Sequence, residues 1–215
     1  MTYTIAVLAG GKSSRFGSNK LLFKIGSRTM LEWVLYAALD SQANEIMLSV
    51  KTPEFNVPDE FTGKLKVIYD ELGEYSPLVG ILSTARLASN SDVVVISADS
   101  PFVTGNFFNL LEAYLKKFDV DGVIPIWDNG KIEAIHAAYK TQSVLAACEM
   151  LIASGNYDVK ALSSVLKKIY FLPVSDLKKR DRLSITDFDN PSEILAGASE
   201  KPHTIYGLDE GETKV

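Results

Sequence analysis

Short apolar runs alternate with segments of helical periodicity along most of this 215-residue chain. Continuous aliphatic and β-branched runs such as 3–9 and 92–99 are typical of buried strands in a parallel sheet. Residues 28–42, with Thr29 as the expected N-cap, carry apolar side chains at helical spacing. This alternation predicts an α/β three-layer sandwich with a mainly parallel or mixed sheet. The expected strands are 3–9, 45–50, 66–70, 92–99, 122–127, 134–140 and 170–174, and the expected helices are 28–42, 78–88, 106–118, 143–155, 159–169 and 192–198.

Two later regions carry more specific expectations. The Asn129-Gly130 pair predicts an antiparallel hairpin between 122–127 and 134–140, within a mixed sheet or a small inserted subdomain. The run KKRDR at 178–182 reads as a solvated loop that could attract an anionic molecule.

Composition excludes several classes of protein. The chain is 47% hydrophobic, enough for one sizeable core or two small ones. Its net charge of −5 leaves no general basic surface for nucleic acid. The single cysteine, Cys148, excludes an internal disulfide and lies in an apolar stretch, which indicates a buried side chain in a reducing compartment. Without a signal peptide or an apolar run of membrane-spanning length, a cytoplasmic protein that binds neither membrane nor nucleic acid is expected.

The stretch LAGGKSSRFGSNK, residues 8–20, follows the first expected strand. Ligands of open parallel sheets bind at this end of the strands, and glycines allow backbone amides to approach an oxyanion. Arg15 offers a planar fork for phosphate oxygens, and Lys20 offers a compact charge. Ala6 stands where a Walker A motif needs glycine, and Lys12 breaks the dinucleotide fingerprint. A polyphosphate loop of another kind is therefore predicted.

Residues 8–26, LAGGKSSRFGSNKLLFKIG, resemble the signature of nucleotidyltransferases that join a nucleoside triphosphate to a phosphorylated acceptor. The most similar family is that of the molybdenum cofactor guanylyltransferases. The Gly10-Gly11 pair matches the guanine-using branch, whereas the cytidylyltransferase relatives usually read L-A-A-G or A-A-G. The resemblance covers about residues 5–195 and implies a Rossmann-like nucleotidyltransferase fold. Further segments that resemble the family are 67–82, 93–103, 130–140 and 187–194.

The resemblance implies roles for particular residues. Arg15, Lys20 and Asp99 are the expected catalytic residues, because two anions must approach each other and their charge must be neutralised. Asp99 is also the expected Mg²⁺ ligand at a strand's carboxyl end. Its alternative role, capping the 106–118 helix, is better served by Thr104. The expected nucleotide-binding residues are Leu8, Ala9, Gly10, Gly11, Ser13, Ser14, Lys20, Ser49, Asp70, Pro77, Gly80 and Asp99.

Four other residues have open roles. Asp187 or Asp189 could supply a second metal contact, or the segment could simply be a capped turn. Both aspartates stand where guanylyltransferases typically have asparagine, and acidic residues there are more usual in the cytidylyltransferases. Glu133 and His136 lie in the acceptor-side segment and are candidate acceptor contacts, although a satisfied strand histidine is the alternative for His136.

The expected reaction is Mg²⁺-dependent transfer of GMP from GTP to the phosphate of molybdenum-carrying molybdopterin, with release of pyrophosphate. The alternatives are a CTP-using molybdopterin cytidylyltransferase, a guanylyltransferase for another acceptor such as cobinamide phosphate, and a nucleotide-binding regulatory protein. The resemblance implies molybdenum-insertion proteins or molybdoenzyme chaperones as partners, and a monomer or weak homo-oligomer. We expect one domain over 1–198, with a nucleotide half at 1–120 and an acceptor half at 121–198, followed by a flexible acidic tail at 199–215.

Overall fold

The computed structural model describes residues 2–10, 20–70, 72–186 and 191–199. The main strands are β1 (Thr4–Leu8), β4 (Glu45–Val50), β5 (Lys66–Tyr69), β6 (Asp92–Ser97), β7 (Gly122–Ile126), β8 (Ala137–Lys140) and β9 (Ile169–Pro173). Within the described residues they form one seven-stranded sheet in the order β5-β4-β1-β6-β8-β7-β9. Neighbouring strands are parallel, except that β8 runs antiparallel to both β6 and β7. The predicted mixed, mainly parallel sheet is confirmed.

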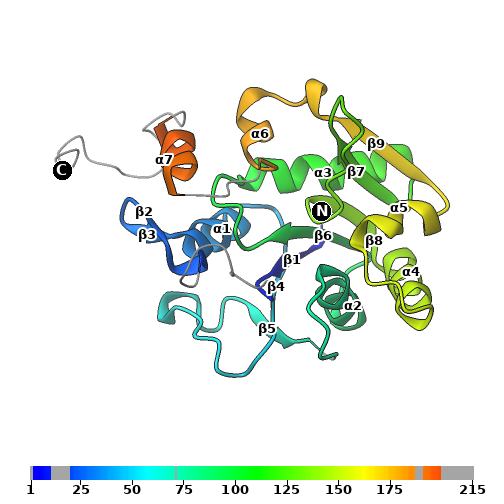
Figure 1. Ribbon diagram of the computed structural model, residues 1–215, viewed down its shortest axis with the longest axis horizontal. Coiled ribbons are helices and arrows are strands. Elements are labelled where there is room, and N and C mark those ends of the chain that lie inside the picture. The colour runs from blue at the N-terminus through cyan, green and yellow to red at the C-terminus, as the bar shows by residue number, and fades with distance from the viewer. Residues whose placement is uncertain (1, 11–19, 71, 187–190, 200–215) are drawn as a thin grey trace.

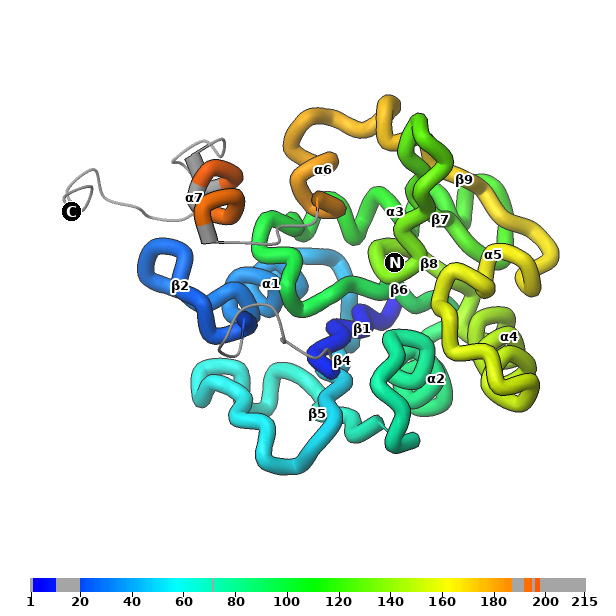
Figure 2. Tube along the Cα trace, in the orientation of Figure 1, coloured from blue at the N-terminus to red at the C-terminus, as the bar shows by residue number. Residues whose placement is uncertain are grey.

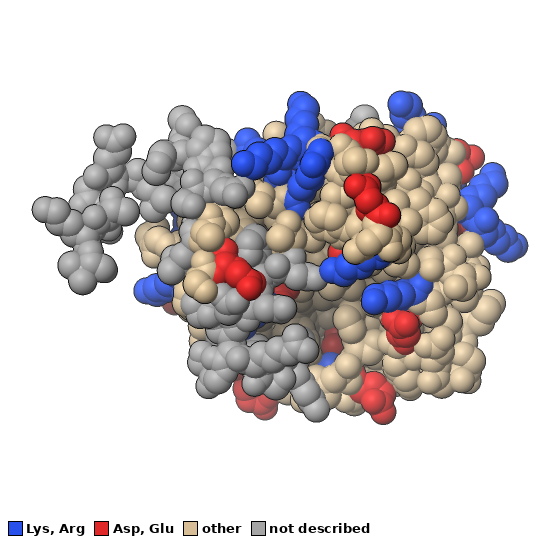
Figure 3. All heavy atoms as spheres, turned by 45° about the horizontal axis from the view of Figure 1, so that its top comes forward, with Lys and Arg blue, Asp and Glu red and all other residues tan. Residues whose placement is uncertain are grey.

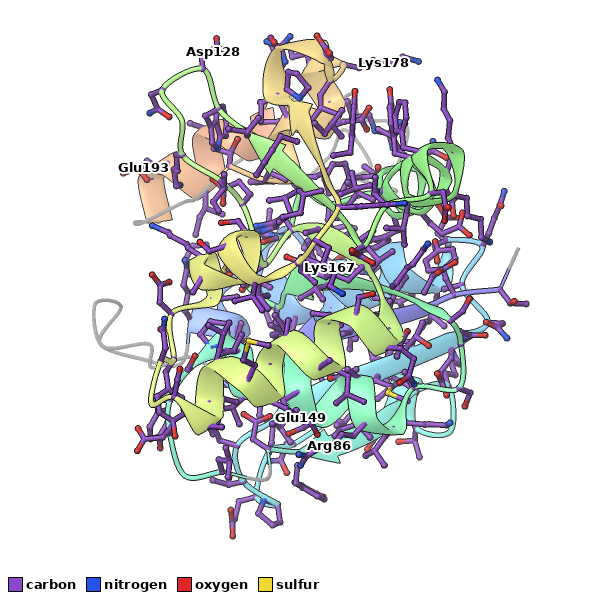
Figure 4. The ribbon with its side chains drawn as sticks, turned by 90° about the vertical axis from the view of Figure 1, so that its right-hand side faces the viewer. Arg86, Asp128, Glu149, Lys167, Lys178 and Glu193 are labelled. Atoms are coloured by element: carbon purple, nitrogen blue, oxygen red, sulfur yellow. The ribbon has the colours of Figure 1, made fainter. Side chains whose placement is uncertain are left out.

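Helices cover both faces of this sheet (Figure 1). The four longest are α1 (Met30–Leu39), α2 (Pro77–Leu87), α3 (Gly105–Phe118) and α4 (Thr141–Ala153). Successive strand residues point to opposite faces, so Ile5 and Val7 of β1 pack with α1 and α3, while Ala6 and Leu8 pack with α2 and α4. On the second face α2 and α4 lie side by side, and Arg86 pairs with Glu149 at 3.0 Å between them (Figure 4). Because side chains along each strand alternate between the two faces of the sheet, helices pack on both faces and form the three-layer sandwich.

Side-chain caps define where the helices begin. Thr29 accepts a hydrogen bond from the Glu32 amide while Glu32 accepts one from the Thr29 amide, which completes a capping box at α1. Thr104 caps α3 through the Phe107 amide, as the sequence predicts. Ser76 caps α2, whose first residue is Pro77.

A smaller unit lies beside the main sheet. The strands β2 (Lys24–Ile25) and β3 (Arg28–Thr29) pair antiparallel and contact the last helix, α7 (Pro191–Ser199). Figure 2 shows α7 beside β2, far along the chain from it. A separate apolar cluster that includes Ile25, Trp33 and Ile194 joins these segments. The remainder of the predicted tail, residues 200–215, lies outside the described residues.

The region 122–140 differs in part from the predicted hairpin. β7 and β8 do pair antiparallel, but through Gly122 with Tyr139 and Val123 with Ala138, and the predicted strand 134–140 begins only at Ala137. Because β8 also pairs with β6, the strands belong to the main sheet and not to an inserted subdomain. Residues 127–136 instead form a loop, which we call the β7–β8 loop. The Asn-Gly turn does occur in it, with Gly130 at φ +83°.

The predicted helix 159–169 is too long. Only a 3₁₀ turn, Val159–Ala161, and the four-residue α5, Leu162–Val165, are helical. Lys168 is held instead by Asp121, whose amide donates to the Lys168 carbonyl at 2.8 Å and whose carboxylate accepts from the Lys168 amide at 3.0 Å. These tertiary hydrogen bonds extend the chain into β9.

The charged run 178–182 was predicted as a loop but forms the short helix α6, Lys179–Leu183. The Arg182 guanidinium donates to the carbonyls of Leu177 and Ser175 at 2.9 and 2.8 Å, which ties the helix to the preceding segment. Figure 3 shows lysine and arginine side chains gathered on this part of the surface.

Parallel strands bring four chain segments to one edge of the sheet. The carboxyl ends of β1, β4, β5 and β6 lead into Gly10, Lys51, Asp70 and the turn that carries Asp99.

On the opposite face from α1, Cys148 is fully buried in α4, as predicted. In the described part of the chain, no helix is long and apolar enough to cross a membrane.

Candidate functional site

A pocket opens at the carboxyl edge of the sheet, between β1, β4, β5 and β6 and the start of α2. This is where open α/β sheets bind their ligands. Its lining residues are Leu8, Gly10, Ser49, Asp70, Tyr75, Ser76, Pro77, Gly80, Ser97 and Ile135.

The pocket brings together most of the described residues that were predicted to bind a nucleotide. Those lining it are Leu8, Gly10, Ser49, Asp70, Pro77 and Gly80. Ala9 lies just behind, where its amide donates to the Ser49 carbonyl at 2.8 Å. A Cβ at Gly80 would lie 2.8 Å from the Ser49 hydroxyl, and one at Gly10 would lie 3.1 Å from the Asp70 carboxylate. Both glycines therefore keep the space around these polar groups open.

Asp70 is held rigidly at one end of the pocket. Its Oδ1 accepts a hydrogen bond from the Ser49 hydroxyl at 2.5 Å, and its Oδ2 lies 3.3 Å from the Lys51 ammonium. The Lys51 ammonium also donates to the carbonyls of Leu72 and Glu74, which ties these two residues before α2 to the end of β4. The Asp70 side chain is only 2% exposed. Asp70 nevertheless lines the pocket, and a carboxylate oxygen with one hydrogen-bond donor beside it has a lone pair left for a second donor.

Asp99 lies in the turn after β6, two residues beyond the strand. Its Oδ1 accepts from the Ser97 hydroxyl at 2.5 Å and its Oδ2 accepts from the Lys20 ammonium at 3.0 Å. Burial by itself would raise the pKa of Asp99, but the Ser97 hydrogen bond and the Lys20 charge bring that pKa below its ordinary value. The Asp99 side chain remains 39% exposed. An ionised carboxylate and an ammonium group thus lie together beside the pocket.

A buried polar network lies behind the Asp99 turn. The His136 ring is 2% exposed, and its Nε2 lies 2.8 Å from the hydroxyl of Ser100, the residue after Asp99. Glu133 is 5% exposed, and its Oε1 accepts from the Trp127 indole at 2.6 Å and from the Lys131 ammonium at 3.0 Å. His136 is therefore held in the β7–β8 loop, one residue before β8, and is not a strand residue.

Six predicted residues lie outside the described part of the chain. They are Gly11, Ser13, Ser14, Arg15, Asp187 and Asp189. Among the described residues no group of three or more histidines, cysteines and carboxylates could hold a metal ion by itself. A single carboxylate such as Asp99 is nonetheless compatible with Mg²⁺, because Mg²⁺ is commonly held by one or two carboxylates together with substrate phosphates and water.

The comparison that decides the family is a profile of the MobA-like NTP transferase domain, which matches residues 5–168. The chain belongs to this family. The resemblance found in the sequence is thereby confirmed, and the protein is a nucleotidyltransferase of the molybdenum cofactor guanylyltransferase type.

Curated relatives of this MobA-like transferase agree. A probable molybdenum cofactor guanylyltransferase of Thermococcus sibiricus is 31% identical over 189 residues, which covers 80% of this chain and 94% of the relative. The protein of the same description in Pyrococcus furiosus is 31% identical over 190 residues, covering 88% and 93%.

Solved structures share the fold. The molybdopterin-guanine dinucleotide biosynthesis protein A of Archaeoglobus fulgidus has a TM-score of 0.75 at 21% identity, over 93% of this chain and 97% of that one. The 2-C-methyl-D-erythritol 4-phosphate cytidylyltransferase of Thermus thermophilus has a TM-score of 0.64 at 14% identity, over 93% and 98%.

Several groups in the site of this MobA-like transferase were not predicted from the sequence. Tyr75 and Ser97 line the pocket, and Lys51 forms an ion pair with Asp70. Ser97 could have been found because it stands two residues before Asp99, a spacing that lets a hydroxyl reach the carboxylate within one turn. Lys51 carries no such signal, because its contacts are with residues about twenty positions away.

Proposed function

We propose that this MobA-like nucleotidyltransferase transfers GMP from GTP to the phosphate of molybdenum-carrying molybdopterin, uses Mg²⁺, and releases pyrophosphate. The observation that carries the choice of GTP is the Asp70 carboxylate at the end of the pocket. The names of the archaeal relatives, probable molybdenum cofactor guanylyltransferases, support the acceptor.

Hydrogen-bond complementarity supports guanine as the base. Guanine presents two neighbouring donors, N1–H and N2–H₂, and a carboxylate can accept from both. Cytosine presents the N4–H₂ donor beside the N3 acceptor, whose lone pair a carboxylate repels. Because Ser49 and Lys51 already fix the Asp70 carboxylate, little conformational entropy is lost when the base binds.

The Asp99 turn supports the transfer step. Asp99 would hold Mg²⁺ together with phosphate oxygens, and the ion would supply neutralisation of the charge that the two anions bring together. Lys20, 3.0 Å from Asp99, would contact phosphates at the same point. An acceptor phosphate oxygen attacks the α-phosphorus of GTP and forms a new P–O bond. The bond between the α-phosphorus and the oxygen that bridges the α- and β-phosphates breaks, and pyrophosphate leaves with that oxygen. No general base is needed, because a phosphate monoester is already ionised near neutral pH.

Pyrophosphate release tests this proposal. The protein is incubated with Mg²⁺, molybdenum-carrying molybdopterin and GTP, CTP, ATP or UTP in turn. We expect release with GTP that depends on both the acceptor and Mg²⁺. Release with CTP alone would overturn the choice of base, and release that does not depend on the acceptor would indicate a hydrolase. Tight GTP binding without any turnover would support a regulatory protein.

Lys20 should compete with a metal ion for Asp99 when no nucleotide is bound, because its ammonium occupies Oδ2. In Lys20→Met, Mn²⁺ binding to the nucleotide-free protein, followed by electron paramagnetic resonance, should strengthen several-fold, roughly as expected when one nearby like charge is removed. Turnover with GTP should fall about 10²-fold, because a phosphate contact is lost.

Lys66→Met is the matched control for Lys20→Met. Lys66 pairs with the buried Glu45 carboxylate at 2.5 Å, at the amino end of β5 and away from the pocket. It should leave both readouts unchanged. Unaltered Mn²⁺ binding in Lys20→Met would contradict competition at Asp99.

A further inference from the structure

The turn that carries Asp99 contacts the β7–β8 loop through a hydrogen bond between Ser100 and His136. Inside the turn, the Ser100 amide donates to the Ser97 carbonyl at 3.2 Å, and the Ser100 carbonyl accepts from the Val103 amide at 3.1 Å. The Ser100 side chain points away from this backbone framework to His136 Nε2, 2.8 Å away. Ser100 is 5% exposed, so this contact is sheltered from water. The Ser100 hydroxyl is therefore held by the His136 ring, while the Ser100 backbone is held within the turn.

The His136 ring is itself held by the loop around it. The His136 amide donates to the Glu133 carbonyl at 3.0 Å, and the Glu133 amide donates to the Pro125 carbonyl at 2.9 Å. The Tyr139 hydroxyl donates to the Ala134 carbonyl at 2.7 Å, which ties the loop to β8. A short chain of hydrogen bonds thus runs from the β7 and β8 strands to the turn after β6.

Glu133 orients the ring electrostatically. Its Oε2 lies 3.8 Å from His136 Nδ1, a buried nitrogen that makes no hydrogen bond. Burial would raise the pKa of Glu133, but the neighbouring His136, Lys131 and Trp127 side chains lower it, so the carboxylate stays ionised. A carboxylate at this distance favours a proton on Nδ1, which leaves Nε2 free to accept the Ser100 hydroxyl.

We propose that His136 is a positioning residue for Asp99 and acts through Ser100, with Glu133 setting the orientation of the ring. Neither His136 nor Glu133 needs to touch the acceptor in this role, because both side chains are buried and already engaged with protein groups. The inference rests on the proposed function in one respect, the metal-binding role of Asp99. Positioning groups behind a metal ligand commonly change metal affinity or activity by about 10–100-fold.

The test uses three single variants of the full chain, the double variant of His136→Asn with Ser100→Ala, and one control. His136→Gln places an amide at about the position of Nε2, where it can still bond Ser100, whereas the shorter His136→Asn cannot reach it. Ser100→Ala removes the other partner. Ser41→Ala is the matched control, because its hydroxyl bonds the Ala38 carbonyl at 2.7 Å just after α1, near the amino end of β4 and so at the opposite edge of the sheet from Asp99.

Three readouts separate positioning from packing. They are Mn²⁺ affinity in the presence of a GTP analogue with a methylene α–β bridge, kcat and KM in the transfer reaction, and the thermal midpoint. We expect His136→Asn and Ser100→Ala each to weaken Mn²⁺ binding about tenfold and to lower kcat by a similar factor. The KM for GTP should stay within about twofold, and the double variant should be no worse than either single variant, because both break the same link.

His136→Gln should restore Mn²⁺ affinity to within about threefold of the wild-type value. Failure of His136→Gln to the same extent as His136→Asn, with the same loss of thermal midpoint, would overturn the proposal in favour of simple packing. A rise in acceptor KM alone would overturn it in favour of a direct acceptor contact. If the wild-type complex with the analogue binds no Mn²⁺, the metal role in the proposed function has failed instead. The Mn²⁺ readout needs no acceptor, so an error in acceptor identity does not affect it.

Discussion

Asp99→Asn should lower kcat for nucleotidyl transfer by about 10³-fold, a loss within the range caused by removing a preorganised electrostatic group. Asparagine has the same shape, but it lacks the negative charge that Asp99 offers to a cation. It would also leave the Lys20 ammonium without its 3.0 Å carboxylate partner. Because the Asp99 side chain is 39% exposed, the free energy of unfolding should change little. Single-turnover kinetics with saturating GTP and acceptor measure the effect directly.

Asp119→Asn is the control for this prediction. Asp119 is an exposed aspartate that pairs with Lys140 at the far end of α3, and its left-handed backbone, at φ 48°, suits asparagine. Its turnover should equal that of the wild type. Turnover of Asp99→Asn within a few-fold of the wild type, with the metal requirement intact, would remove Asp99 from the metal site.

Asp70→Asn should change which base the protein accepts. The asparagine amide can still accept from guanine N1–H, but its NH₂ group faces the guanine N2–H₂, so two donors meet. The kcat/KM for GTP should fall about 10²-fold, in line with a lost charged hydrogen bond in a buried site, and the loss should lie mostly in KM. Xanthosine triphosphate has a carbonyl at that position, which the NH₂ group can bond. The variant should therefore prefer xanthosine triphosphate to GTP, whereas the wild type should prefer GTP.

Glu45→Gln controls for the loss of a buried ion pair. Glu45 is 7% exposed and bonds Lys66, Thr4 and Ser89 at the amino end of β4, away from the pocket. It should reduce stability without changing the ratio of the two nucleotides. Equal losses for GTP and xanthosine triphosphate in Asp70→Asn would contradict direct reading of the base by Asp70.

The sequence allowed the layered fold to be predicted because its signals are local. The apolar runs mark the strands, and Thr29 and Thr104 mark helix starts through hydrogen bonds to residues three positions away. Parallel strands then fix which ends meet, so Asp70 and Asp99 fall at one edge of the sheet. Position along the chain was enough to place both groups.

Tertiary hydrogen bonds explain the errors. The helix predicted over 159–169 ends early because Asp121, far away in sequence, binds the Lys168 backbone. The strand predicted from residue 134 starts late because Glu133 and His136 turn inward to other partners. A satisfied His136 was one of the alternatives that its apolar neighbours left open, but the sequence did not indicate which groups His136 and Glu133 contact. No pattern within one segment indicates partners that lie in another.

The sequence likewise predicted some residues of the site and missed others. Ser49, Asp70 and Gly80 were found through resemblance to known segments, and they do meet in one pocket. Lys51 was missed because a lysine after a strand is common, and only the fold shows its contact with Asp70.

A competition for transfer tests the central claim most directly. Equal concentrations of GTP and CTP, each labelled at the α-phosphate with a different isotope, are offered together with Mg²⁺ and molybdenum-carrying molybdopterin. The ratio of the labels in the dinucleotide product is the ratio of kcat/KM for the two nucleotides. We predict that the guanosine label exceeds the cytidine label by at least about 10²-fold, as expected for a site that bonds the base edge. A product that carries mainly the cytidine label, or no α-phosphate label at all, would contradict the account.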